Sequence, residues 1–592
     1  MLQKIGLSLF IIALLIFTLM LGLDNYELTA DAISANTDYH KKEILVQAET
    51  AGMLGKTYNS NISFISDFKN VLKNAQESLN AQPIPEGVSE WDFKLGNWNI
   101  KDYVFQTTKN AGNGIVSKNP VLFFLLTFGL GILGGILYII PKFQTLPGIK
   151  NNHIYQRSLT RGLKVGPRGF ILGATILGVI IYGVFYMNGD LLWPIITAVM
   201  TLLIIGLVLF YQKQKKLNPD RSASPNLTGM LGLFTGLYLI GFYILLYWSP
   251  QYLTPWITMV SPISEMLSGK PASQWFLYGL LYTVIVIVMG VRMIAKYRHN
   301  KYQIVRTFSV MFFQTCIAFI LPEILVRLNR PYFDFKNIWP LDYDFFFDWN
   351  INNLIESGGL GVFMLVWGIA LTILGVPIIT YFFGKRWYCS WVCGCGGLAE
   401  TMGDPFRQLS DKSLEAWQYE RWIIHGVLAF SVIMTGLVLY TYFTGAYNVL
   451  FLNSDSVRTW YGFLIGSAFA GVVGTGFYPL MGNRVWCRFG CPLAAYLGLV
   501  QRFKSRFRIT VNGGQCISCG NCSTYCEMGI DVRHYAQRGQ DVVRSSCVGC
   551  GVCAAVCPRG VLRLENASED VGQRTEELRV IHIKEGEVGL LY

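Results

Sequence analysis

The sequence has few charged residues for its length. Only 15% of its 592 residues are Asp, Glu, Lys or Arg, whereas 52% are hydrophobic, and the mean hydropathy is positive. This composition does not fit a soluble multidomain protein, and lipid is the expected solvent for most of the chain. The net charge of +12 does not indicate nucleic acid, because the cations gather in short loops beside apolar segments, where they meet anionic lipid headgroups.

Cysteine is absent from the first 315 residues, and thirteen of the fourteen cysteines follow residue 388. These thirteen stand in tight, ligand-like spacings, which are typical of thiolates kept reduced for metal binding rather than of disulfides. The remaining cysteine, Cys316, stands alone in an apolar run and is predicted to be a packing residue.

Histidine is also scarce. The chain has six histidines and no C-x-x-C-H motif, which excludes covalently bound c-type haem. Membrane b-type haem needs paired histidines within spans, and only His425 lies in one, so no haem is expected. His425 is a candidate for proton transfer to a quinone, with hydrogen-bonded packing as the alternative. Glu323, an acid near the outer end of its span, is a second candidate, and its alternative is that it reaches the interface.

About ten apolar runs are long enough to cross a bilayer, whose core of about 30 Å needs roughly 20 residues per helix. They lie near 5–23, 121–141, 168–188, 190–211, 228–248, 275–296, 307–325, 360–383, 422–445 and 461–482. The first run resembles a signal peptide in having Lys4 before it, but its length and the lack of a clean cleavage site predict a retained anchor.

The short loops predict the orientation, because translocation of Lys and Arg is disfavoured. The loops after the even-numbered spans carry the basic residues, for example Lys142, Lys213, Lys296, Lys385 and Arg484. The opposite face carries an aromatic loop with Asp334, Asp342, Asp344 and Asp348. The sequence therefore predicts a multi-pass protein of the cytoplasmic (inner) membrane with both termini in the cytoplasm.

The predicted fold class is membrane all-α, followed by a cytoplasmic, two-cluster ferredoxin-like α+β domain. The parts are an N-terminal anchor (1–23), an extracytoplasmic domain (24–120), spans two to seven (121–325), an extracytoplasmic aromatic and acidic loop (326–359), spans eight to ten (360–500) and the ferredoxin domain with its tail (501–592). The 24–120 part has helical-looking pieces, such as 65–79, and no cofactor motif. A scaffold or docking role is expected for it.

The C-terminal part contains C-x-x-C-x-x-C-x-x-x-C twice. In ferredoxins with this spacing, the fourth cysteine of each run ligates the other [4Fe–4S] cluster. One cluster is therefore predicted on Cys516, Cys519, Cys522 and Cys557, and the second on Cys547, Cys550, Cys553 and Cys526. Structural zinc sites are the alternative. Glu527 replaces the proline that usually follows the first run, which predicts a more exposed cluster or a shifted potential.

Two C-x-x-x-C pairs, Cys389 with Cys393 and Cys487 with Cys491, stand where even-numbered spans reach the cytoplasmic face. The i, i+4 spacing places both thiols of a pair on one side of a helical turn. If the two spans are neighbours, four thiolates converge there and bind a third metal or iron–sulfur centre. The alternative is that these cysteines pack helix ends. Cys395 is a fifth thiol nearby.

The segments KRWYCSWVCGCGG and NRVWCRFGCPLAAYLG, followed by the doubled cluster motif, resemble the NosR/NapH type of polytopic membrane ferredoxins and the related oxidase-assembly polyferredoxins. The resemblance covers roughly residues 360–560. It implies electron transfer between quinone or cytoplasmic donors and a partner redox protein in anaerobic respiration. The family pattern has C-x-x-x-C-P twice, whereas Gly394 and Cys395 follow Cys393 here. No Ser/Thr-Gly-Ala-Thr motif occurs in 24–120, so covalent flavin is not expected.

Three functions remain open from the sequence. The first is electron transfer from the ferredoxin clusters to the centre of the C-x-x-x-C pairs, and from there to quinone or a partner redox protein. The second is a metal-ion reductase that matures a respiratory metalloenzyme. The third is a redox-sensing scaffold without turnover. Because paired cubanes beside four further thiolates form a path rather than a single switch, the first function is favoured. The direction of electron flow stays open.

Overall fold

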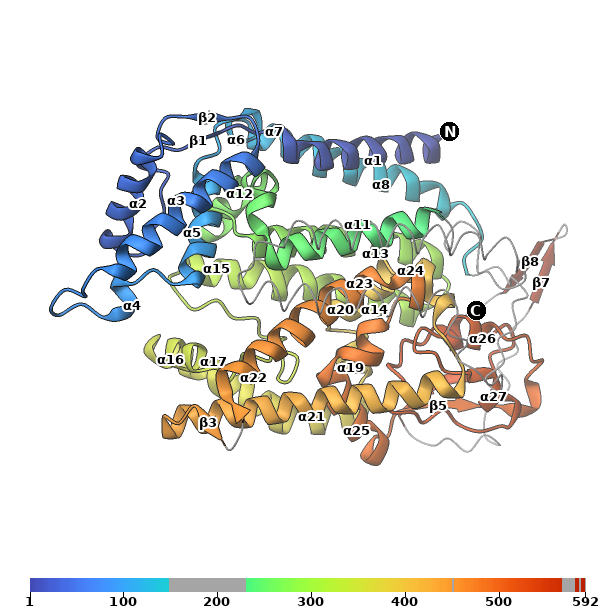
Figure 1. The fold of residues 1–592 in the computed structure, drawn as a ribbon. Coiled ribbons are helices and arrows are strands. Elements are labelled where there is room, and N and C mark those ends of the chain that lie inside the picture. Colours follow the sequence, from blue (N-terminus) through green and yellow to red (C-terminus); the bar gives the residue numbers. More distant parts are fainter. Residues whose placement is uncertain (149–229, 450–451, 567–580, 585–586, 591–592) are drawn as a thin grey trace.

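The computed structural model describes residues 1–148, 230–449, 452–566, 581–584 and 587–590. Long helices lie side by side as a bundle (Figure 1). The N-terminal domain lies at one end of this bundle, and the C-terminal strands and short helices lie at the other. The two non-membrane parts therefore stand on opposite sides of the helices.

Among the residues that the structure describes, six helices are long and apolar enough to cross a membrane. They are Leu2–Gly22 (α1 and η1), Pro120–Phe143 (α7, η2, α8 and η3), Gln274–Tyr297 (α13), Lys301–Arg327 (α14, η6 and α15), Gly359–Phe383 (α17, η7 and α18) and Leu414–Thr444 (α21). Each overlaps one of the predicted spans. Together they make the described part of the chain a membrane protein by length and composition.

The other four predicted spans are not all open to comparison. Two of them, 168–188 and 190–211, lie outside the described residues. The span at 228–248 corresponds to α11 (Met230–Trp248). Within it, the apolar segment Phe234–Trp248 is shorter than the six membrane-spanning candidates. The last one, 461–482, overlaps a helical segment that begins at Ser454 and ends at Gly476, six residues before the predicted end. This helix ends because Phe477 leaves the helical conformation, and a separate one-turn helix, α24 (Tyr478–Met481), follows with Pro479 in its first turn.

The N-terminal domain has its own apolar core. The core is formed mainly by three helices and a short antiparallel ribbon: α2 (Asp38–Thr50), α3 (Asn61–Ala81), α5 (Asn97–Asn110), and β1 (Tyr26–Glu27) with β2 (Thr57–Tyr58). Thr37 and Ser60 begin α2 and α3 as N-caps, because their hydroxyl oxygens accept backbone N–H bonds. The helix expected near 65–79 is thus present within α3.

Short elements connect the bundle and surround the cysteines. Those near the N-terminal domain are α4 (Glu90–Phe93), α6 (Ile115–Lys118), η5 (Pro250–Leu253) and α12 (Thr254–Ser268). Those nearer the cysteines are α16 (Asp348–Glu356), α19 (Arg386–Cys389), α20 (Gly394–Thr401), η8 (Asp404–Leu409), β3 (Asn448–Val449), β4 (Leu452–Asn453), α22 (Ser454–Tyr461), η9 (Gly462–Val473), α23 (Gly474–Gly476), α24 (Tyr478–Met481), η10 (Trp486–Gly490) and α25 (Pro492–Lys504). Several are single turns, so the chain around the cysteines changes direction often.

The C-terminal module is an α+β unit. Its strands β5 (Arg508–Val511) and β6 (Leu562–Glu565) pair antiparallel, with Arg508 opposite Glu565. Between them lie η11 (Gly513–Gln515), α26 (Asn521–Thr524), α27 (Val532–Gln537) and α28 (Val552–Ala555). A second hairpin, β7 (Ile581–Lys584) with β8 (Glu587–Leu590), follows.

One apolar core joins this module to the membrane helices. It contains Val376 of α18, Leu497 of α25, Ile509 of β5 and the cysteines of the C-x-x-x-C pairs. Because these side chains are buried together, the module packs directly on the helices.

Candidate iron–sulfur centres

The first group of C-terminal thiols lines one cavity. Its lining includes Cys516, Cys519, Cys522 and Cys557, the four cysteines that the crossed pairing predicts for one cluster. The sulfur of Cys522 interacts electrostatically with the other three. Burial raises the pKa of the Cys522 thiol to about 12, so a bound metal must supply the charge that holds it as a thiolate. Four convergent thiols on one cavity fit a cubane cluster.

The second group is formed in the same way. Cys553 interacts electrostatically with Cys550, Cys547 and Cys526, and also with Cys522 of the first group. The two groups are therefore neighbours. The backbone N–H of Ile530 donates to Cys526 Sγ at 3.4 Å, a contact that stabilises a thiolate.

The local sequence explains how each run wraps around its site. Gly520 and Gly551 stand between ligands with φ of 80° and 73°, and each begins a one-turn helix, α26 or α28. Only glycine takes this left-handed conformation without cost. The repeated glycine therefore turns each run in the same manner, and the two halves are built alike.

The two C-x-x-x-C pairs also share one geometry. Cys389 ends α19 and Cys393 is the N-cap of α20. Cys487 lies in η10 and Cys491 is the N-cap of α25. Each pair thus spans a break between two helices. The sequence-based expectation of a single helical turn was wrong in this respect, because Cys393 and Cys491 have extended backbone conformations.

These four thiols nevertheless converge. They are between 4% and 7% exposed, and Cys491 interacts electrostatically with Cys487, Cys393 and Cys389. The pairs are almost 100 residues apart in the sequence, so tertiary packing brings them together; α18 packs on α25, and α21 packs on α25 and on η10. The fifth thiol, Cys395, hydrogen-bonds with Cys393. Cys316 lies in η6 (Phe313–Ile320) and is partly buried.

A buried ionic network lies between the converged thiols and the second C-terminal group. Arg484 donates to the backbone oxygen of Cys389 at 3.2 Å and to Cys487 Sγ at 3.7 Å. The same guanidinium pairs with Glu400 at 2.6 Å and with Glu527 at 2.9 Å. Glu527 follows Cys526 directly, so one arginine contacts the surroundings of both sites.

Glu527 is completely buried, and Arg407 holds it with a 2.7 Å ion pair. Burial alone would raise the pKa of the Glu527 carboxyl. The positive charges of Arg407 and Arg484 outweigh this effect and lower the pKa to about 2. The sequence predicted a more exposed cluster or a shifted potential; Glu527 itself is fully buried, and the shifted potential stays a prediction. The second group contains two buried cysteines, Cys547 and Cys553, and the first contains one. The carboxylate finds partners in the membrane half, where a proline would find none.

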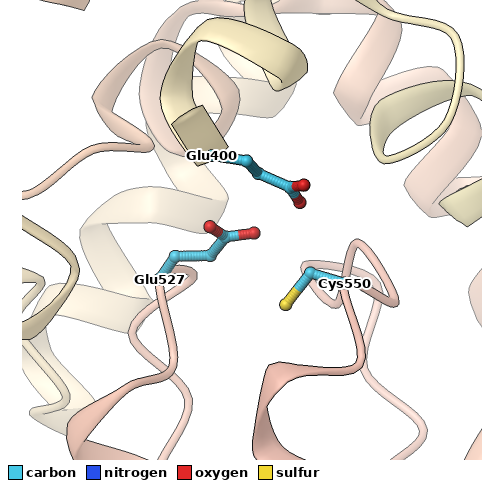
Figure 2. Close-up of side chains that lie close together, drawn as sticks. All are labelled: Glu400, Glu527 and Cys550. Carbon is cyan, nitrogen blue, oxygen red and sulfur yellow. The ribbon is translucent and has the colours of Figure 1, made fainter. Parts of the chain in front are cut away.

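Figure 2 shows Glu400 and Glu527 with Cys550 beside them, and their ligand atoms lie within 4.8 Å of one another. Such a set can hold a metal ion, but its charges argue otherwise. Five cations pair with the three carboxylates of this network, which are Glu400, Glu527 and Asp404; the cations are Arg292, Lys296, Arg306, Arg407 and Arg484. An excess of positive charge repels a metal ion and favours a negative thiolate-bound cluster at Cys550.

Side chains of the membrane half also hold the loop of the second group. Ser390 donates to Val548 O at 2.7 Å, Tyr302 to Gly549 O at 2.9 Å and Gln303 to Cys550 O at 2.8 Å. Gln501 completes the set with a bond to Cys547 O at 3.0 Å. Four successive carbonyls therefore accept bonds from the helices, which fixes this loop beside the converged thiols.

The two proton-transfer candidates lie elsewhere. His425 is on α21 and is partly buried, and the charges that act on it are those of Arg421, Arg502 and Lys385. Glu323 hydrogen-bonds with Ser268 at the end of α12. The structure does not bring either side chain into the thiol groups described above.

The comparisons with known proteins match both cysteine regions. The family described as 4Fe-4S binding domain matches residues 366–413 and 462–510, which contain both C-x-x-x-C pairs. The family described as 4Fe-4S dicluster domain matches residues 515–562. The chain therefore carries ferredoxin-type 4Fe–4S domains in both regions.

One curated relative is the "Putative electron transport protein YccM" of Escherichia coli (strain K12). It is 27% identical over 191 residues, which are 30% of this chain and 52% of the relative. The chain spans about half the length of this relative. No solved structure matches the chain. Together with the apolar helices, these matches support iron–sulfur electron transfer by a membrane protein.

Proposed function

We propose that this protein carries electrons between two C-terminal [4Fe–4S] clusters and a third, thiolate-bound centre in the membrane half, and exchanges them there with quinone or a partner redox protein. The observation that carries the proposal is the contact of Arg484 with both regions. Its guanidinium touches Cys487 Sγ and pairs with Glu527, the residue after Cys526.

The proposed ligands of the three centres are the cysteines whose thiols converge in the structure. The two clusters take the eight C-terminal cysteines in the crossed pairing, and the third centre takes Cys389, Cys393, Cys487 and Cys491. The match of a 4Fe–4S binding family to both C-x-x-x-C pairs supports an iron–sulfur cluster at the third site. Iron–sulfur clusters supply one-electron redox chemistry over a wide range of potentials.

The chain's own residues arrange and insulate these sites. The hydrogen bonds from Ser390, Tyr302 and Gln303 keep the second C-terminal group in a fixed place beside the membrane half. The excess of cations in the ionic network offsets the negative charge that clusters bring to a buried place. The apolar core around the cysteines excludes water. These features serve electron transfer between fixed centres.

The proposal also includes the type of ferredoxin, the number of spans and the orientation in the membrane. The chain belongs with the NosR/NapH type of polytopic ferredoxins, has about ten spans and lies in the inner membrane with both termini cytoplasmic. The basic residues after the even-numbered spans support this orientation. The opposite positions of the N-terminal domain and the C-terminal module, visible in Figure 1, are compatible with it.

The test is the iron and acid-labile sulfide content of protein purified without oxygen, together with EPR spectra after reduction with dithionite. The wild type is compared with a variant in which Cys389, Cys393, Cys487 and Cys491 are changed to Ala. Three cubanes require about twelve irons, and the variant should retain about eight with the C-terminal signals intact. About eight irons in both proteins would rule out a third iron–sulfur centre. The absence of iron from the wild type would refute the whole proposal.

A further inference from the structure

The loop between α15 (Leu321–Arg327) and α16 (Asp348–Glu356) does not stay at the end of the bundle. It was expected on the outer face, yet Ile338 is 1% exposed within the same apolar core as Cys393 and Cys487. Leu341 packs against that core as well. This part of the chain therefore folds back into the protein and reaches the core that contains the converged thiols.

The folded-back loop carries a cation to the thiols. Lys336 is 11% exposed at its side chain, and its ammonium group interacts electrostatically with the sulfurs of Cys393 and Cys395. Asp334 holds it with an ion pair of 3.2 Å. The ammonium nitrogen lies 3.7 Å from the position that a Cβ atom on Gly394 would occupy.

Gly394 is the residue at which the two C-x-x-x-C sites differ. Both second cysteines are N-caps, but the first helical position after them is Pro492 in α25 and Gly394 in α20. A Cβ on Gly394 would lie 2.7 Å from Gln314 Oε1, a contact too close to accommodate without movement. The space of the missing side chain is thus taken by the polar ends of Gln314 and Lys336. The departure from the repeated motif makes room for the lysine.

We propose that Lys336 is a positioning residue that raises the reduction potential of the centre on Cys389, Cys393, Cys487 and Cys491. The inference rests on the proposed function, because it requires an iron–sulfur centre at that site. Reduction adds one negative charge to such a centre, and a buried cation stabilises the more negative form. Lys336 therefore favours electron flow from the C-terminal clusters toward this centre.

The experiment is an EPR-monitored redox titration of the purified full-length protein and of Lys336→Met and Lys336→Arg. Removal of the charge should lower the reduced-to-oxidised ratio of the third centre at least tenfold at a fixed potential, which is about 59 mV for one electron. Lys336→Arg should stay near the wild-type value. The C-terminal signals should not move in either variant, so they serve as an internal control.

Two further variants protect the test from a folding defect. The double variant Asp334→Asn, Lys336→Met leaves no unpaired buried carboxylate and should still show a lowered potential. Gly394→Pro restores the motif of the other site, should displace the lysine and should act in the same direction. An unchanged potential in Lys336→Met and in the double variant, with about twelve irons bound, would overturn the inference alone. Loss of the third centre from Lys336→Met and from the double variant, with retention in Lys336→Arg, would also overturn the inference, because the lysine would then be needed only for assembly of the site. About eight irons in the wild type would instead overturn the proposed function.

Discussion

Glu527 offers the sharpest test of how the C-terminal module is attached. Its carboxylate pairs with Arg407 at 2.7 Å and Arg484 at 2.9 Å, and all three side chains are at most 1% exposed. Removal of one partner from a buried pair leaves an uncompensated charge and costs about 3–5 kcal/mol. The change Glu527→Gln keeps the side-chain volume and the bond from Ser410 to the backbone oxygen of residue 527. Because Arg484 retains Glu400, we expect the lower end of this range.

The assay is urea titration of the detergent-solubilised protein, followed by its visible iron–sulfur absorbance, with limited proteolysis of the C-terminal module in parallel. A loss of about 3 kcal/mol corresponds to a more than hundredfold change in the equilibrium. Two control variants distinguish loss of the module's attachment from loss of any buried or exposed ion pair. Glu420→Gln breaks a buried pair with Arg488 within the membrane half, in which the side chains are 5% and 3% exposed, and should destabilise without selective cleavage of the module. Asp455→Asn breaks an exposed pair with Arg458 and should cost about 1 kcal/mol or less. If Glu527→Gln differed from the wild type by no more than Asp455→Asn does, the reasoning would be refuted.

Two further predictions concern the two ends of the molecule. Burial lowers the pKa of His40, which hydrogen-bonds with Tyr103 at 2.8 Å, so the N-terminal domain should be fully stable above about pH 6.5 and lose stability as the pH falls below it. Thermal unfolding followed by tryptophan fluorescence between pH 8 and pH 5 should show this loss, and His40→Gln should flatten the profile; an equally steep profile in the variant would contradict it. Gly520→Ala forces an L-residue to φ of 80° beside the first thiol group and should cost about 1–2 kcal/mol, with less iron bound after reconstitution. Gly514→Ala is the matched control, because its Cβ would meet only Asn512 Oδ1 at 3.9 Å, and equal iron content in both variants would contradict the expectation.

Much of the cofactor chemistry could be predicted from local sequence. The spacing of the C-terminal cysteines, repeated once, predicts which four thiols share a site, and the structure brings those same groups together. The apolar runs predict the six long helices because a span needs only length and hydropathy, which are properties of a continuous segment. The predicted boundary of the last run, 461–482, was wrong by six residues, because the helix ends at Gly476.

The surroundings of the sites could not be predicted in this way. Glu527 was noticed only as a missing proline, and nothing in its neighbours indicates that Arg407 and Arg484, distant in the sequence, are its partners. Lys336 stands in an aromatic, acidic loop that the sequence predicts on the outer face, yet its ammonium nitrogen lies 3.7 Å from the position of a Cβ on Gly394, the residue after Cys393. The glycine after Cys393 was a signal in the sequence, since it departs from the repeated motif, but its meaning depends on what fills the space.

The sequence by itself predicts the candidate ligands and the membrane character of this protein, because ligand spacing and hydropathy are properties of short, continuous segments. Only the tertiary structure decided which charges face the ligands and how the thiol groups are connected. The C-x-x-x-C pairs, the folded-back loop and the arginines meet through the packing of helices that are far apart in the chain. A buried charge is tolerated only where its partners converge, and that convergence is a property of the whole fold.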